Sequence, residues 1–133
     1  MNDEIQAKLD TYPEHIKPYI LDIRTLIFEV AKEQNQKIEE SLKWNELSYS
    51  VKDGSNIRLD WKEKHPKNYF LYFSCQSKLV ETFKKVYFDM LTFEKNRAII
   101  LEIEKPLQRD IVKHCIEVAF QYKKNKNLPM LGI

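Results

Sequence analysis

Glycine is almost absent from this chain: its 133 residues include only Gly54 and Gly132. Loops that cradle the phosphates of a nucleotide need several glycines close together, because the backbone must approach the ligand closely. Neither a dinucleotide-binding fingerprint nor a P-loop is therefore present. The sequence argues against a nucleotide-dependent enzyme.

Cysteine is equally scarce. Cys75 and Cys115 are far apart and belong to no C-x-x-C pair, so neither a disulfide framework nor a zinc knuckle has support. We expect two reduced, buried thiols. His114 adjoins Cys115, but adjacent residues on a helix point about 100° apart, which argues against a catalytic Cys–His pair. No histidine spacing fits a zinc site, and no serine stands in a G-x-S-x-G elbow.

Long apolar runs and an excess of one charge are also missing. No apolar run approaches the roughly 18 residues of a membrane span, and the opening residues lack the layout of a signal peptide. The 22 basic and 20 acidic side chains leave a formal charge of +2, which is too balanced for a nucleic-acid footprint. We expect one cytoplasmic domain over residues 1–133 with no nucleic-acid or membrane partner. The sequence indicates no particular oligomeric state.

Helical periodicity is the clearest feature that is present. Apolar residues recur at three-and-four spacing within residues 16–30 and predict a helix over residues 14–33, with Pro18 in its first turn. A shorter amphipathic segment predicts a second helix over residues 37–44.

The apolar period changes to two from residue 47. Residues 47–51 and 57–61 each alternate between apolar and polar side chains, and they flank Asp53-Gly54. Asp-Gly is a strong hairpin signal, because glycine accepts the positive φ that tight hairpin turns require. Residues 69–73 form a continuous apolar run that suits a central strand. These three segments predict an antiparallel meander.

The last third predicts a helix over residues 79–86, a strand over residues 97–103 and a final helix with Pro106 in its first turn. Residues 125–133 either fray or pack back onto the domain. The predicted fold class is α+β: two layers, with an antiparallel sheet of about four to five strands and N- and C-terminal helices packed on one face.

Three segments of the chain form a recognisable combination: Tyr12 with the following IKPYILDIRTLIFEVA, EESLKW at residues 39–44 leading to Tyr49, and AIILEIEKPLQRDIVKHC. With these segments the chain resembles the YdhG-like domain family, a widespread group of small bacterial proteins. Family members usually carry a Gly-Met-Pro type turn after the tryptophan, where this chain has Asn45-Glu46-Leu47-Ser48. The resemblance implies the same two-layer fold. A branch of the family is described as a frataxin-like iron chaperone that supports iron–sulfur and haem assembly.

A candidate ligand-binding group lies around residue 44. Trp44 and Tyr49 could wall a groove, Lys43 could meet an anion there, and Arg58 on the next predicted strand could join them. The alternative is that both aromatics anchor the core while Lys43 lies over them. The first interpretation predicts a non-enzymatic binding or chaperone-like domain for a small molecule or a protein.

A candidate iron site comes from the resemblance together with the first predicted helix. Asp22, Glu29 and Glu33 can share one face of that helix, and iron held for delivery favours exposed oxygen ligands. Basic residues are interspersed along the same helix, so an ordinary solvated face of mixed charge is the competing interpretation. In the iron hypothesis the metal is bound transiently; otherwise no cofactor is expected. A third possibility, an enzyme acting on an unidentified small molecule, would need a convergent polar pocket.

Overall fold

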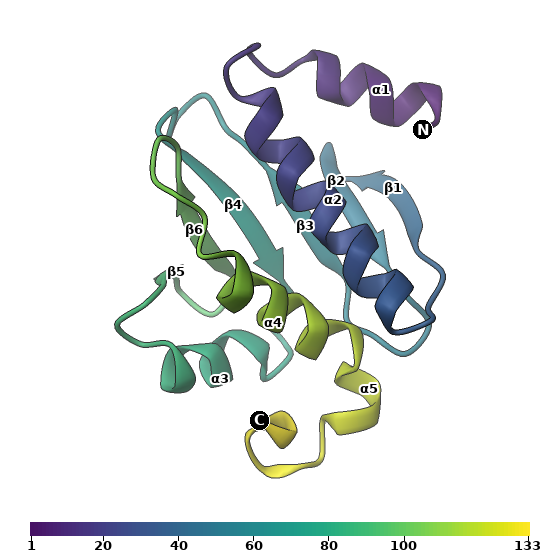
Figure 1. The fold of residues 1–133 in the computed structure, drawn as a ribbon, viewed down its shortest axis with the longest axis vertical. Coiled ribbons are helices and arrows are strands. Elements are labelled where there is room, and N and C mark those ends of the chain that lie inside the picture. Colours follow the sequence, from purple (N-terminus) through teal and green to yellow (C-terminus); the bar gives the residue numbers. More distant parts are fainter.

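A computed structural model describes residues 1–133 (Figure 1). The strands of the chain form one antiparallel sheet of six strands. The strands are β1 (Glu39–Lys43), β2 (Glu46–Ser50), β3 (Ile57–Asp60), β4 (Asn68–Phe73), β5 (Thr92–Glu94) and β6 (Ala98–Glu102). The helices are α1 (Asp3–Asp10), α2 (Lys17–Glu33), α3 (Leu79–Val86), α4 (Arg109–Phe120), α5 (Tyr122–Asn125) and the 3₁₀ turn η1 (Pro129–Gly132). None of the helices has the length and apolar character that crossing a bilayer requires.

The strands are arranged in the order β1-β2-β3-β4-β6-β5, with every neighbouring pair antiparallel. The predicted meander of β2, β3 and β4 is confirmed, and so is the strand β6. Two further strands, β1 and β5, form the edges of the sheet. The α+β prediction is therefore correct, and the sheet has one strand more than expected.

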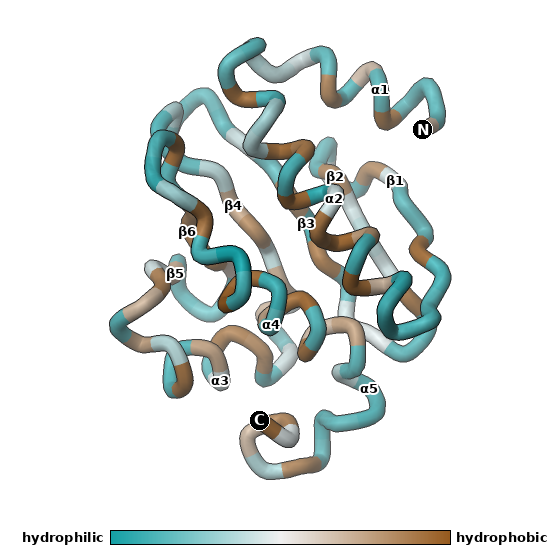
Figure 2. The backbone as a smooth tube through the Cα atoms, in the orientation of Figure 1, coloured by the Kyte–Doolittle hydropathy of each residue, from teal (hydrophilic) through white to brown (hydrophobic).

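The main core lies between the sheet and the two long helices. Figure 1 shows α2 and α4 lying over the same face of the sheet. Figure 2 shows hydrophobic segments in β3 and β4 and on the turns of α2 and α4 that overlie them; the connection after α3 and the C-terminal turn also contain hydrophobic segments. One continuous cluster of 30 buried residues fills this layer, so both helices and the sheet share a single core.

The helix α1 is an element that the periodicity analysis did not predict. Asn2 caps it by accepting a hydrogen bond from the Ile5 amide at 2.9 Å, and Asp3 and Glu4 occupy its first turn. Ile5 and Leu9, one turn apart, are buried. The cap, the acidic first turn and this apolar pair were a readable signal for a short helix.

The predicted helix over residues 37–44 is wrong, because this segment is the strand β1. Ile38 and Leu42 are four residues apart, a spacing that places side chains on one face in a helix and in a strand alike. Two other features favour the strand. Asn35, with φ of 55°, ends α2, and Glu40 turns toward α2 to pair with Arg24 at 2.6 Å.

The final helix begins at Arg109, later than the predicted start at Pro106. The preceding segment is held as a connection, because the Gln108 side chain donates to the Met90 carbonyl at 2.6 Å and the Glu104 amide donates to the Tyr19 hydroxyl at 3.2 Å. At the C-terminus, residues 125–133 pack back, with Leu131 buried in the main core.

Gly54 serves a different purpose from the one predicted. Its φ is not positive, and the connection between β2 and β3 is longer than a two-residue turn. A Cβ at this position would lie 2.7 Å from the Phe120 Cα. Next to it, the Ser55 amide donates to the Ala119 carbonyl at 2.9 Å. Glycine is therefore required because the hairpin packs directly on the backbone at the end of α4.

The two cysteines have different environments. Cys115 is buried in the main core, and burial raises the pKa of its thiol to about 12, which keeps it protonated near neutrality. Cys75 is exposed, so the prediction that both thiols are buried is wrong for this residue. It lies in the connection between β4 and α3, outside the layers that the apolar pattern defines.

Candidate functional site

The sheet has a second face, turned away from α2 and α4, and the candidate site lies there. Strand alternation turns Leu47 and Tyr49 of β2 toward the helices and turns Glu46 and Ser48 the other way. On this second face Arg58 of β3 stands directly between Ser48 of β2 and Tyr72 of β4. Arg58 therefore occupies the middle of the face.

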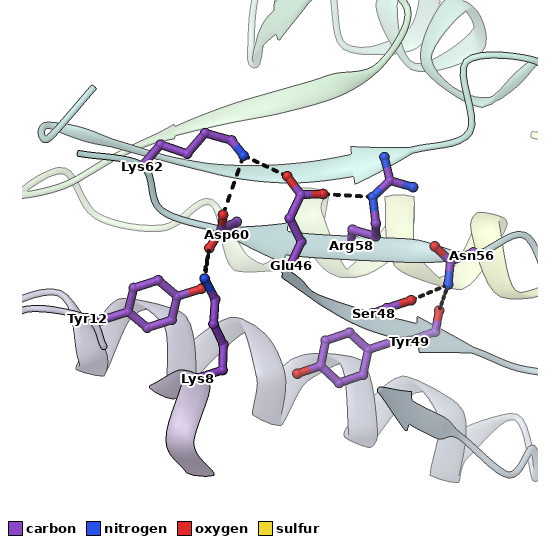
Figure 3. A network of polar contacts seen from close by, with 9 residues as sticks. All are labelled: Lys8, Tyr12, Glu46, Ser48, Tyr49, Asn56, Arg58, Asp60 and Lys62. Carbon is purple, nitrogen blue, oxygen red and sulfur yellow. Dashed lines mark hydrogen bonds and ion pairs between the residues drawn. The ribbon is translucent and has the colours of Figure 1, made fainter. Parts of the chain in front are cut away.

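The guanidinium of Arg58 is held from three directions. Its Nε donates to Glu46 Oε1 at 2.8 Å, its Cζ lies 4.8 Å from the centre of the Trp44 ring, and Tyr72 faces it at 5.8 Å. Both terminal nitrogens make no hydrogen bond within the protein, and Figure 3 shows them pointing away from Glu46. Two parallel N–H donors on a fixed plane match the two oxygens of a carboxylate or a phosphate.

Trp44 is held at the tip of the hairpin between β1 and β2. Lys43 pairs with Glu46, which leaves Trp44 and Asn45 as a two-residue turn with φ of 51° and 61°. Asparagine tolerates this left-handed conformation, whereas a bulky residue such as tryptophan adopts it at a cost of roughly 1–3 kcal/mol. The indole is nevertheless 80% exposed. The turn therefore presents a large aromatic side chain to solvent in a strained conformation.

A network of ion pairs extends from Arg58 through the sheet. Its members are, in order, Arg58, Glu46, Lys62, Asp60 and Lys8. Figure 3 shows Arg58, Glu46 and Lys62 on one side of the strands and Lys8 on the other, with Asp60 between them. Asp60 also accepts a hydrogen bond from the Tyr12 hydroxyl. Burial first, and then the Asp60 charge, raise the pKa of Tyr12 above its ordinary value.

The network is short of one negative charge. Three cations face only two carboxylates, so one positive charge has no counterpart among its members. Glu46 and Asp60 are almost completely buried, whereas the Lys62 side chain is 42% exposed. Burial is the largest single influence and opposes the charged form of Lys62, but the hydrogen bond to Glu46 and the nearby negative charges together outweigh it and raise the pKa of the lysine. The uncompensated charge is therefore available at the surface where Arg58 has free donors.

Tyr49 does not join this site, in contrast to the predicted pairing with Trp44. It is fully buried on the helix side of the sheet, where its ring packs edge-on against Phe28. Its hydroxyl lies near the ion pair between Arg24 and Glu40 but makes no hydrogen bond. Burial first, and then the Glu40 charge, raise the pKa of Tyr49. Tyr49 is thus a core residue, and Lys43 is an exposed neighbour of the Arg58 site.

Removing these two tyrosine hydroxyls should have opposite consequences for stability. We expect Tyr12→Phe to lower the free energy of unfolding by about 1–3 kcal/mol, because a buried carboxylate loses a hydrogen bond. We expect Tyr49→Phe to leave it unchanged or raise it by up to about 1 kcal/mol, because a buried hydroxyl without a partner is removed. Urea denaturation of the two variants checks this. A larger loss for Tyr49→Phe than for Tyr12→Phe would contradict the assignment.

The three carboxylates of the iron hypothesis are not gathered into one group. Glu29 pairs with Arg109 and with Lys113, and Glu33 pairs with Lys113 at 3.0 Å. Asp22 is exposed in another part of α2, beside a cavity near Tyr69. No group of three or more histidine, cysteine or acidic side chains in the structure is placed to hold a metal ion. Iron at this face would have to displace the cations of α4 from Glu29 and Glu33.

The sequence interpretation missed Glu46, Lys62 and Tyr72, which position or flank Arg58. A partial signal existed, because β2 and β3 each carry charged residues in their outward phase. Their meeting depends on the strand register, which places Ser48 opposite Arg58 and so brings Glu46 within reach of the guanidinium. Periodicity identifies the two faces of a strand but does not align one strand with the next.

Fold and site together define a class of protein: a single-sheet α+β domain with an arginine–tryptophan cluster on the sheet face opposite its helices. The five principal cavities lie elsewhere, and neither Trp44 nor Arg58 lines any of them. Comparison with protein-family models, with curated proteins and with solved structures gave no match.

Proposed function

We propose that this domain is a non-enzymatic intracellular binding module that holds an anionic group of its partner against Arg58. The observation that carries the proposal is the guanidinium itself, whose Nε is bonded to Glu46 while both terminal nitrogens have no partner. Arginine fixed in this way loses little conformational freedom on binding, and its fork selects two oxygens in one plane. Trp44 adds an exposed apolar surface directly beside the fork.

Two other functions fit the geometry less well. Iron delivery would require Glu29 and Glu33 to exchange Arg109 and Lys113 for a metal ion. An enzyme acting on a small molecule would need polar groups that converge in a cavity, whereas Arg58 lies on an open sheet face. The resemblance to the YdhG-like family is compatible with the binding proposal, because its most specific segment, EESLKW, ends in Trp44.

A titration with sodium acetate and, separately, with inorganic phosphate tests the proposal. The ¹⁵N signals of the arginine Nε–H and tryptophan Nε1–H groups report on individual side chains. We expect saturable shifts of Arg58 and Trp44 at millimolar anion, as a single, partly exposed, charge-assisted site allows. Arg24, whose guanidinium is already bidentate with Glu40, should not respond.

Two matched substitutions control this titration. Arg58→Lys keeps the charge but loses the fork, so the saturable shift of the Trp44 Nε1–H signal, which still reports on the site, should disappear. Arg109→Lys makes the same change at an exposed arginine between α4 and α2 and should leave the response of Arg58 intact. If the shifts persist in Arg58→Lys, or spread equally over all arginines, the proposal is wrong.

A further inference from the structure

We infer that the partner bound at this face is a protein segment that carries a single carboxylate next to an apolar side chain. The inference rests on the proposed function and names the chemistry of the partner. Three features of the site lead to it: its shape, its charge and the conformation of Trp44.

The shape of the site favours a protein over an enclosed small molecule. Arg58 stands in the middle of a six-stranded sheet, and the principal cavities of the molecule lie elsewhere. Small ligands are usually held in concave pockets, whereas protein interfaces are flatter and rely on a few buried aromatic and arginine side chains. An exposed tryptophan stacked on an arginine, at 4.8 Å, is such a pair.

The charge of the site favours a carboxylate over a phosphate. The ion-pair network has one uncompensated positive charge, which a single carboxylate neutralises. A phosphate carries between one and two negative charges near neutrality and would add repulsion from Glu46, which lies 2.8 Å from the Arg58 Nε. Beyond Tyr72 on the same face, Glu94 adds a further negative charge.

The conformation of Trp44 indicates that the aromatic surface is set in place before the partner arrives. Tryptophan occupies a left-handed turn position that asparagine would fill with less strain, yet its ring stacks on Arg58 and not on the core. Fixing the side chain in the unbound protein lowers the entropy that binding must remove. A segment that reaches Arg58 with its carboxylate can place a neighbouring apolar side chain on the indole.

Fluorescence and ¹⁵N titrations with three blocked hexapeptides test the inference. Each peptide has one leucine beside a single glutamate, a single glutamine or a single phosphoserine, with glycine and serine at the other positions. We expect the glutamate peptide to shift Trp44 and Arg58 and to bind at least about tenfold more tightly than the glutamine peptide. It should also bind more tightly than acetate. Arg58→Lys and Trp44→Asn should each weaken binding of the glutamate peptide by about tenfold.

Two controls protect the result against unfolding and against unspecific binding. Trp44→Asn places a turn-compatible residue at an exposed position, so its thermal midpoint should not fall. Trp61→Phe changes the other tryptophan, which donates to the Pro66 carbonyl outside the site, and should leave peptide binding unchanged.

The outcomes separate this inference from the proposed function. If acetate shifts Arg58 but the glutamate peptide binds no better than acetate, the inference of a protein segment as partner is wrong, while the proposed anion site remains supported. If the phosphoserine or glutamine peptide matches the glutamate peptide, the carboxylate assignment is wrong. If neither acetate nor any peptide moves Arg58, both proposals fall.

Discussion

Asp60→Asn should be among the most destabilising single substitutions in this protein, lowering the free energy of unfolding by about 3–5 kcal/mol. Asp60 is 5% exposed and is the ion-pair partner of Lys8, which is 8% exposed and lies 3.3 Å away. Asparagine keeps an oxygen that can accept the Tyr12 hydrogen bond but removes the charge. The lysine is then buried without a counterion, which costs far more than a lost surface pair.

Urea denaturation followed by circular dichroism measures this loss. Glu14→Gln is the matched control. It neutralises a carboxylate that is also paired with a lysine, Lys17, but the Glu14 side chain is 91% exposed. We expect the control to change stability by less than about 0.5 kcal/mol. The double variant Lys8→Met with Asp60→Leu should recover much of the loss, because it removes both buried charges. A loss below about 1 kcal/mol for Asp60→Asn would show that Lys8 finds another partner or water.

Gly54→Ala should lower the free energy of unfolding by about 2–3 kcal/mol, although alanine is ordinarily tolerated in a loop whose φ is not positive. The added Cβ would lie 2.7 Å from both the Phe120 Cα and the Val51 Cγ2. The first of these is backbone and cannot rotate away, so the hairpin and the end of α4 must separate. The backbone hydrogen bond from Ser55 to Ala119 should weaken with them.

Amide hydrogen exchange distinguishes this mechanism from a general loss of stability. Protection should fall first at the Ser55 amide and at the Lys123 amide, which donates to the Asp53 carbonyl at 3.1 Å. Gly132→Ala is the contrasting variant, in which the backbone conformation is strained but the neighbouring side chain can move. The φ of Gly132 is 78°, and the nearest atom to a new Cβ is the flexible end of Leu128 at 3.3 Å. If Gly54→Ala is as stable as the unaltered protein, the close approach of hairpin and helix is wrong.

Elements with a long or unambiguous apolar period were predicted from the sequence, because burial of one face is written directly into residue spacing. The meander β2–β3–β4 and the helices α2 and α3 belong to this group. The segment 37–44 was assigned to the wrong type, because a spacing of four residues fits a helix and a strand equally. The Asp-Gly pair predicts a tight hairpin turn at Gly54, but the reason for glycine there is contact with Phe120 at the end of α4, which lies far along the chain.

The candidate site shows the same division. The sequence predicts one anion site with an aromatic wall from Lys43, Trp44, Tyr49 and Arg58, and the structure brings Trp44 and Arg58 into contact. Tyr49 lies apart from them. It follows Trp44 closely in sequence, but strand alternation turns it to the helix side of the sheet. Proximity along a strand therefore misleads where opposite faces have different functions.

Residue order alone was sufficient for the fold class and the balance of charge, since these depend on composition and on short-range periodicity. Which charged residues meet could not be obtained in this way. The pairing of Arg58 with Glu46, and of Asp60 with Lys8, requires the register of neighbouring strands and the docking of α1 beneath them. Those contacts join side chains that are remote in the chain, so only packing of the whole core brings them within a few ångströms.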